Sequence, residues 1–266
     1  MTVPGGGRWG DLQTRLISAV FMLLVGGVEV WLGGQSFALM VAVLTGVMIW
    51  ELAAMVRPLF GRESIYLGLI TGFGLLAALN HPSPLAPLLL LVIPVALLFP
   101  AVVGRFAFAC YAAVIIISGY SLVSLRDTFG VGAILWLISI VIASDVLGYF
   151  AGRSLGGPKF WPAISPKKTW SGTVAGWIGA ALVGLGFVVF ANAGWGLVIL
   201  SPFIAFAGQM GDIAESWVKR RTGVKDASHL IPGHGGVLDR FDALIGAVVS
   251  VMLIGLILPL PLPMGH

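Results

Sequence analysis

The residues best suited to chemistry begin with a polar helix face that starts at Asp212. Asp212, Ser216 and Lys219 are spaced four and three residues apart, which places them along one face of a helix, with Glu215 beside them. Within a membrane a carboxylate costs roughly 2.5 to 3.5 kcal/mol on insertion scales, so we expect this face to line a polar cavity. A simpler interpretation is that these residues lie at the membrane interface just past a helix end. It requires several polar positions to be interfacial by accident at the same time.

A glycine-rich turn follows in PGHGGVLDRFD, residues 232–242. Its PG and HGG steps let the backbone turn sharply and approach a ligand closely. Two separated carboxylates, Asp212 and Asp239, stand beside lysines and arginines, which suits a divalent metal that holds a polyphosphate. Oxygen ligands favour magnesium over zinc. His229 and His234 fit no zinc spacing, so a hydrogen-bonding or turn role is expected for them.

A second basic segment is GRSLGGPKFWPAISPKKTWSG, residues 152–172. Its glycines and prolines disfavour a regular helix. In SPKKT, Lys167 and Lys168 stand between hydroxyl residues and offer point charges together with hydrogen-bond donors, which suits phosphate. An ordinary positive-inside loop would explain the charge but explains SPKKT less well. No P-loop pattern GxxxxGK[ST] is present, so a nucleotide site must be of another design.

Membrane helices are the elements that must position these residues. The chain has 266 residues, of which 58% are hydrophobic and 10% are charged, and its mean hydropathy is +1.02. Soluble proteins are about 25% charged. The fold class is therefore interpreted as an all-α polytopic integral membrane protein. About nine transmembrane helices are predicted, over residues 16–34, 36–56, 64–80, 84–103, 105–125, 129–151, 173–193, 195–218 and 241–261.

The basic residues predict the orientation. With nine spans, every lysine and arginine except Arg126 falls on the side of the N-terminus, which the positive-inside rule makes cytoplasmic. The N-terminal segment lacks a small-residue cleavage site, so an uncleaved first helix is expected. The net charge of +4 then reflects topology, and no nucleic-acid partner is expected. A single cysteine, Cys110, allows neither an internal disulfide nor a multi-cysteine metal site.

The charges also divide the chain. Residues 1–141 are interpreted as a transmembrane scaffold of about five helices and the start of the sixth, with charges mostly serving as anchors at helix ends. Residues 142–266 are interpreted as the catalytic part, with cytoplasmic loops at 152–172 and 219–240. Asp145, near the cytoplasmic end of the sixth span, is expected to join the same cavity. Metal, carboxylates and basic side chains at one membrane face favour phosphoryl or nucleotidyl transfer between a soluble nucleotide and a lipid.

The second half of the chain also resembles a known family. A run of residues at fixed spacing is similar to the signature of the phosphatidate cytidylyltransferase (CDP-diacylglycerol synthase) family: Ser216, Lys219, Arg220, Lys225, Asp226, Ser228, Ile231, Pro232, His234, Gly235, Gly236, Asp239, Arg240 and Asp242. SPKKT and the segment around Asp145 also resemble the family. One departure lies after SPKKTW, where the family usually has Glu and this chain has Ser171.

The resemblance implies a magnesium-dependent reaction of CTP with phosphatidic acid that gives CDP-diacylglycerol and pyrophosphate. It places the active site at the cytoplasmic face of a bacterial-type inner membrane. Asp212 and Asp239 would bind metal and, with Lys219 and Ser216, form the catalytic group. Substrate binding would fall to Arg220, Lys225, Asp226, His234, Gly235, Gly236, Arg240, Lys167, Lys168 and Asp145.

Several points stay open at this level. The resemblance leaves room for a second metal ion and for a homodimer. An enzyme that uses CTP on another lipid phosphate is the closest alternative. A membrane transporter is a weaker one, because the charges gather at one face and do not mark a path through the bilayer.

Overall fold

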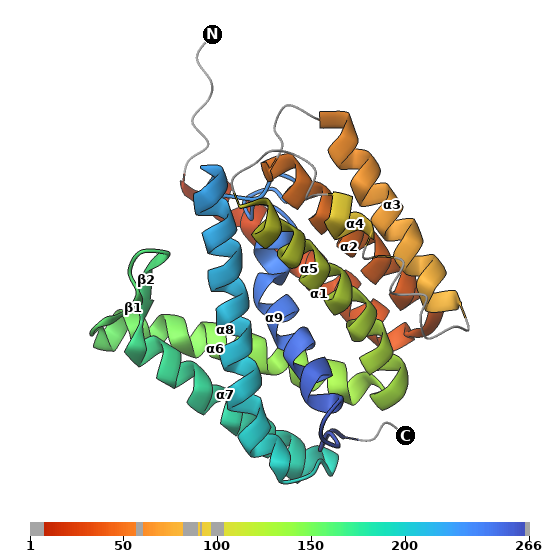
Figure 1. Cartoon of the computed structure of the whole chain (residues 1–266). Coiled ribbons are helices and arrows are strands. Elements are labelled where there is room, and N and C mark those ends of the chain that lie inside the picture. The colour runs from red at the N-terminus through yellow and green to blue at the C-terminus, as the bar shows by residue number, and fades with distance from the viewer. Residues whose placement is uncertain (1–7, 57–60, 82–89, 91, 97–103, 264–266) are drawn as a thin grey trace.

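The computed structural model describes residues 8–56, 61–81, 90, 92–96 and 104–263 (Figure 1). Most of the described chain is helical. Its helices are α1 (Arg8–Leu32), α2 (Gly34–Val56), α3 (Gly61–Asn80), α4 (Val92–Ala96), α5 (Arg105–Phe129), α6 (Val131–Leu155), α7 (Trp170–Ala191), α8 (Gly196–Thr222) and α9 (Leu238–Gly255). Helices α8 and α9 run side by side in the middle of the molecule (Figure 1).

Six of the described helices are long and apolar enough to cross a membrane, namely α2, α3, α5, α6, α7 and α8. Helix α7 is apolar all round and leaves Ile178, Leu182 and Phe190 exposed, as a helix in contact with lipid does. The prediction of an all-α polytopic membrane protein is therefore confirmed. The count of nine spans and the orientation stay predictions.

The helix ends differ from the predicted spans in several places. The predicted fourth span, 84–103, lies largely outside the described residues, and α4 is the helical part described there. Helix α8 continues past the predicted end at 218 to Thr222, and α9 begins at Leu238, ahead of the predicted start at 241. Helix α9 ends at Gly255 because Pro259 soon follows, and a proline disfavours helix at the residue before it and blocks continuation of the helix.

A small β-hairpin joins α6 to α7. Its strands β1 (Lys159–Trp161) and β2 (Ser165–Thr169) are antiparallel, and Figure 1 shows the hairpin standing out from the ends of the two helices. Helix α6 continues through Gly152 to Leu155, so the predicted non-helical segment 152–172 begins with a last helical turn. From residue 156 to 169 the backbone is non-helical, as expected. The SPKKT sequence is strand β2, which places both of its lysines on the hairpin.

Helices α8 and α9 approach each other closely at two glycines. A Cβ added at Gly211 would collide with the backbone carbonyl of Asp242, and one added at Gly246 would collide with the carbonyl of Ala207. Small residues at such a crossing allow two membrane helices to pack backbone against backbone. Gly211 directly precedes Asp212, so this contact brings carboxylates of both helices together.

A buried apolar cluster connects the first half of the chain to the signature segment. Ile49 and Leu52 of α2 belong to the same cluster as Ala227, Val237 and Leu238. The turn between α8 and α9 therefore packs on α2 and is held by more than its own two helices. The division into a scaffold and a catalytic part stays a prediction.

Candidate functional site

A cavity of about 680 Å³ lies where α6, the β-hairpin, α7, α8 and the start of α9 meet. A second cavity, of about 330 Å³ between α2 and α3, is lined by apolar residues and Trp50, so the first is the candidate for chemistry. The structure brings both predicted loops and Asp145 into one cavity, while the roles of the residues stay predictions. The charged residues that line it are Asp145, Arg153, Lys159, Lys167, Lys168, Asp212, Asp239 and Asp242.

The hairpin supplies the basic wall of this cavity. Lys168 Nζ lies 2.5 Å from Asp212 Oδ2 and donates to the backbone carbonyl of Gln209 at 3.3 Å. The end of the hairpin is held by Thr169, which caps α7 by accepting the backbone N–H of Gly172. The ion pair of Lys168 therefore closes the hairpin onto the acidic face of α8, and cations face carboxylates across the cavity.

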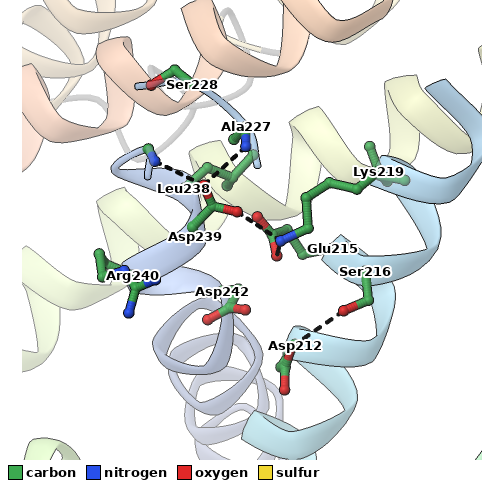
Figure 2. Close-up of polar contacts among 12 residues, drawn as sticks. Asp212, Glu215, Ser216, Lys219, Ala227, Ser228, Leu238, Asp239, Arg240 and Asp242 are labelled. Atoms are coloured by element: carbon green, nitrogen blue, oxygen red, sulfur yellow. Dashed lines mark hydrogen bonds and ion pairs between the residues drawn. The ribbon is translucent and has the colours of Figure 1, made fainter. Parts of the chain in front are cut away.

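The predicted polar face of α8 is present in the structure. Asp212, Glu215, Ser216 and Lys219 all lie on the side of α8 that faces α9 (Figure 2). Ser216 Oγ donates to Asp212 Oδ1 at 3.4 Å, and Lys219 Nζ lies 2.6 Å from Glu215 Oε2. Ser216 and Lys219 do not line the cavity themselves. They contact Asp212 and Asp239, which line it.

Three carboxylates from α8 and α9 form a group that could hold a metal ion. One oxygen from each of Asp212, Glu215 and Asp242 lies within 4.8 Å of the other two. Glu215 is 0% exposed, and its Oε1 has no hydrogen-bond partner among the described residues. A buried carboxylate oxygen without a partner is costly, and a hard cation would satisfy it. The donor set thus fits a divalent cation. Neither Glu215 nor Asp242 is assigned a site role from the sequence, although both stand in segments with polar patterning.

Asp239 makes a different set of contacts. Its Oδ1 lies 2.6 Å from Lys219 Nζ, and its Oδ2 accepts the backbone N–H groups of Ala227 at 2.9 Å and Gly236 at 2.7 Å (Figure 2). Asp212 belongs to the carboxylate group, whereas Asp239 joins Lys219 to the turn between the two helices. That Asp212 and Asp239 together bind metal stays a prediction.

One buried carboxylate that contacts the turn between α8 and α9 is missed by reasoning from the sequence. Glu51 of α2 is 0% exposed and accepts the hydroxyl of Ser228 at 2.5 Å and the backbone N–H groups of Val237 and Leu238 at 2.9 and 2.7 Å. Its charge was expected to anchor a helix end. The available signal was its place inside the predicted span 36–56, because a carboxylate there is costly without polar partners.

The other predicted substrate-binding residues do not line the cavity; these are Arg220, Lys225, Asp226, His234, Gly235, Gly236 and Arg240. Some of them shape the turn. Arg240 Nε donates to the carbonyl of His234 at 2.9 Å, and Ile231 forms an isolated β-bridge with Gly235. These contacts fold the glycine-rich turn against the first turn of α9. The proposed substrate contacts of these residues stay predictions.

Ser171, the departure from the family pattern, stands at the base of the hairpin. Its hydroxyl donates to the carbonyl of Gly156. Because that hydroxyl has one proton, it accepts from the Thr169 hydroxyl, which lies 3.0 Å away. Thr169 in turn accepts the N–H of Gly172. Ser171 thus links the two ends of the hairpin.

Most of the chain is similar to known cytidylyltransferases. Residues 13–258 match the model of the cytidylyltransferase family. A phosphatidate cytidylyltransferase of Brucella abortus is 37% identical over 261 residues, which cover 94% of this chain and 96% of that protein. A phosphatidate cytidylyltransferase of Haemophilus influenzae is 42% identical over 126 residues, or 45% of this chain and 44% of that protein. One from Staphylococcus saprophyticus is 43% identical over 117 residues, or 43% of this chain and 45% of that protein.

Proposed function

The chain belongs to the cytidylyltransferase family, and we propose that it is a phosphatidate cytidylyltransferase. In this reaction CTP and phosphatidic acid give CDP-diacylglycerol and pyrophosphate. The observation that carries the proposal is the cavity in which the lysines of the hairpin face the carboxylates of α8 and α9. The lysines can bind a triphosphate and the carboxylates can bind a divalent cation. The membrane helices beside the cavity can bind the lipid substrate.

The transfer requires positioning more than acid–base chemistry. A phosphate oxygen of phosphatidic acid attacks the α-phosphorus of CTP, and a new P–O bond forms. The bond from that phosphorus to the bridging oxygen of pyrophosphate breaks at the same centre. Because the lipid phosphate is already anionic, it needs no strong general base. The protein then contributes alignment of the two substrates and neutralisation of charge.

The acidic wall is the place for the metal. Asp212, Glu215 and Asp242 would hold magnesium, the hard cation that carboxylate oxygens favour. A bound magnesium ion would neutralise the triphosphate and orient its α-phosphorus. Lys219 bridges Glu215 and Asp239, because its Nζ lies 2.6 Å from an oxygen of each carboxylate. Its charge offsets the charges of these two carboxylates.

The basic wall would bind the triphosphate. Lys167 and Lys168 lie on β2, and Arg153 and Lys159 line the same cavity. Lys168 pairs with Asp212, so a phosphate and a cation would each take one member of that pair. Arg220, Lys225 and Arg240 lie outside the lining and would contact the substrates from the turn. CTP would enter from the cytoplasm and phosphatidic acid from the inner-membrane bilayer.

The test is transfer of label from CTP labelled at the α-phosphate into chloroform-soluble lipid. Purified protein with phosphatidic acid and magnesium is expected to give labelled CDP-diacylglycerol. Asp212→Asn should abolish the product, whereas Asp127→Asn, the same change at an exposed residue outside the cavity, should not. Label that enters another lipid phosphate but not phosphatidic acid would overturn the assigned substrate. No labelled lipid from folded protein with any lipid phosphate would overturn the reaction.

A further inference from the structure

We propose that Glu51 is a positioning residue for the carboxylates of the active site, although it stands on α2 and outside the signature. Its carboxylate holds the α8–α9 turn, residues 223–237, and the first backbone N–H of α9. The proposal deepens the proposed function. It rests on that function only where activity is measured.

The contacts of Glu51 use both carboxylate oxygens. Oε1 accepts the hydroxyl of Ser228 and the N–H of Val237, and Oε2 accepts the N–H of Leu238. The two N–H groups stand at the start of α9, where backbone donors have no partner within the helix and where the helix dipole also favours a negative charge. One side chain from α2 therefore binds both ends of the segment that runs from Ser228 to Leu238.

The turn is fitted closely around this carboxylate. A Cβ added at Gly236 would lie 2.6 Å from Glu51 Oε1, so the backbone approaches the oxygen as only a glycine allows. Val237 and Leu238 are buried in the apolar cluster that α2 shares with α5. A buried carboxylate with three donors has one arrangement that satisfies it, which makes the position of the turn specific.

The same turn places Asp239. The backbone N–H groups of Gly236 and Ala227, both within the turn, donate to Asp239 Oδ2, while Lys219 Nζ forms an ion pair with Oδ1. Leu238, held by Glu51, is the residue directly before Asp239. A turn released from Glu51 would move both donors of Asp239. The start of α9, which also carries Asp242, would move with them.

A hydrogen bond from α1 also reaches the turn. The hydroxyl of Ser18 in α1 donates to the carbonyl of Pro232 at 3.1 Å. This contact is exposed, unlike that of Glu51, and reaches the tip of the turn. Glu51 is thus the buried attachment, at the end of the turn nearest the catalytic carboxylates.

The decisive variant is Glu51→Gln. It preserves volume but replaces one acceptor oxygen by an NH₂ group, which faces donors and cannot accept from them. Thr45→Ala is the matched control, since Thr45 is also fully buried on α2 and its hydroxyl bonds back to the carbonyl of Val41. Both variants change a buried polar side chain of α2. Only Glu51→Gln touches the turn.

Amide hydrogen exchange of the protein in detergent, followed by mass spectrometry, measures the stability of the turn and does not depend on enzyme activity. In Glu51→Gln we expect exchange over residues 224–243 to rise by about tenfold or more, with exchange in α5 and α6 unchanged. Activity should show kcat reduced by about tenfold and a higher magnesium concentration for half-maximal rate. Thr45→Ala should match the wild type in both measurements.

Two results would overturn the role of Glu51. One is wild-type exchange in the turn of Glu51→Gln. The other is faster exchange spread equally over α2, α5 and α9 with an unchanged magnesium dependence, which indicates a general loss of stability. Ser228→Ala removes one of the three donors and gives the same test, with a smaller rise expected, if Glu51→Gln does not fold. If the wild type forms no labelled lipid, the proposed function fails while the exchange measurement still decides on Glu51.

Discussion

Lys219 and Asp239 are joined by a 2.6 Å ion pair between Nζ and Oδ1, which ties the last turns of α8 to the first turn of α9. The same ammonium group lies 2.6 Å from Glu215 Oε2. The side chains of Lys219, Asp239 and Glu215 are 14%, 4% and 0% exposed. Solvent therefore screens this group of charges poorly, and each charge depends on the others.

Replacing the lysine at the centre of this group should destabilise the protein strongly. Lys219→Met leaves Glu215 and Asp239 buried without their counter-charge, which typically costs about 3–5 kcal/mol. Thermal unfolding in detergent is the measurement. Arg62→Met, at an exposed residue, is the control and should leave the melting temperature almost unchanged. Equal melting temperatures for the two variants would show that the ion pairs contribute no stability.

The magnesium dependence should distinguish the carboxylates of the site. Asp242→Asn removes a member of the group that could hold a cation, so we expect a magnesium requirement raised by about tenfold or more. Asp239→Asn alters the partner of Lys219 and should lower kcat with a smaller change in that requirement. Reaction rates of the two variants, measured across a magnesium titration, test this difference. An equal shift for Asp239→Asn would make Asp239 a metal ligand, as the sequence predicts.

The hairpin lysine that pairs with Asp212 should determine nucleotide affinity. Lys168→Met removes a cation from the cavity wall, and we expect weaker CTP binding by about tenfold or more, with lipid affinity unchanged. Lys168→Arg should retain more of the affinity because the charge remains. Equilibrium binding of CTP to protein without lipid is the measurement. Unchanged binding in Lys168→Met would remove the hairpin from the nucleotide site.

Ser171 should stabilise the hairpin locally. Ser171→Ala breaks the link from the Gly156 carbonyl to the Thr169 hydroxyl, so backbone exchange over residues 157–169 should rise. The KM for CTP should increase by about three- to tenfold, since Lys168 is less well held. Ser124→Ala, on α5 and outside the cavity lining, is the control for loss of one hydroxyl. Exchange equal to that of the wild type would show that Ser171 has no such role.

Local patterns in the sequence were sufficient for the individual helices and for one helix face. Continuous apolar runs indicate membrane spans because a bilayer requires them, and six described helices meet that requirement. The spacing of Asp212, Ser216 and Lys219 depends only on helix geometry, so their common face is predictable. The end of α8 extends further than hydropathy suggests, because charged residues can continue a helix beyond the membrane core.

Contacts between distant segments were not predictable in this way. Glu51 and Ser228 lie 177 residues apart in the chain, and no helical period or turn rule relates them. Asp212 and Asp242 meet because Gly211 and Gly246 let α8 and α9 pack closely, which is a property of two helices together.

The amino-acid sequence by itself determined that the chain enters a membrane, where its polar segments lie and which chemistry their side chains favour. Only the tertiary structure decided which carboxylates lie together, that Lys219 forms an ion pair with Asp239, and that Glu51 of α2 binds the turn before α9. The physical reason is that hydropathy and helical period act within a segment. The partners of a buried charge are chosen by packing between segments, where each buried polar group must find a donor or acceptor.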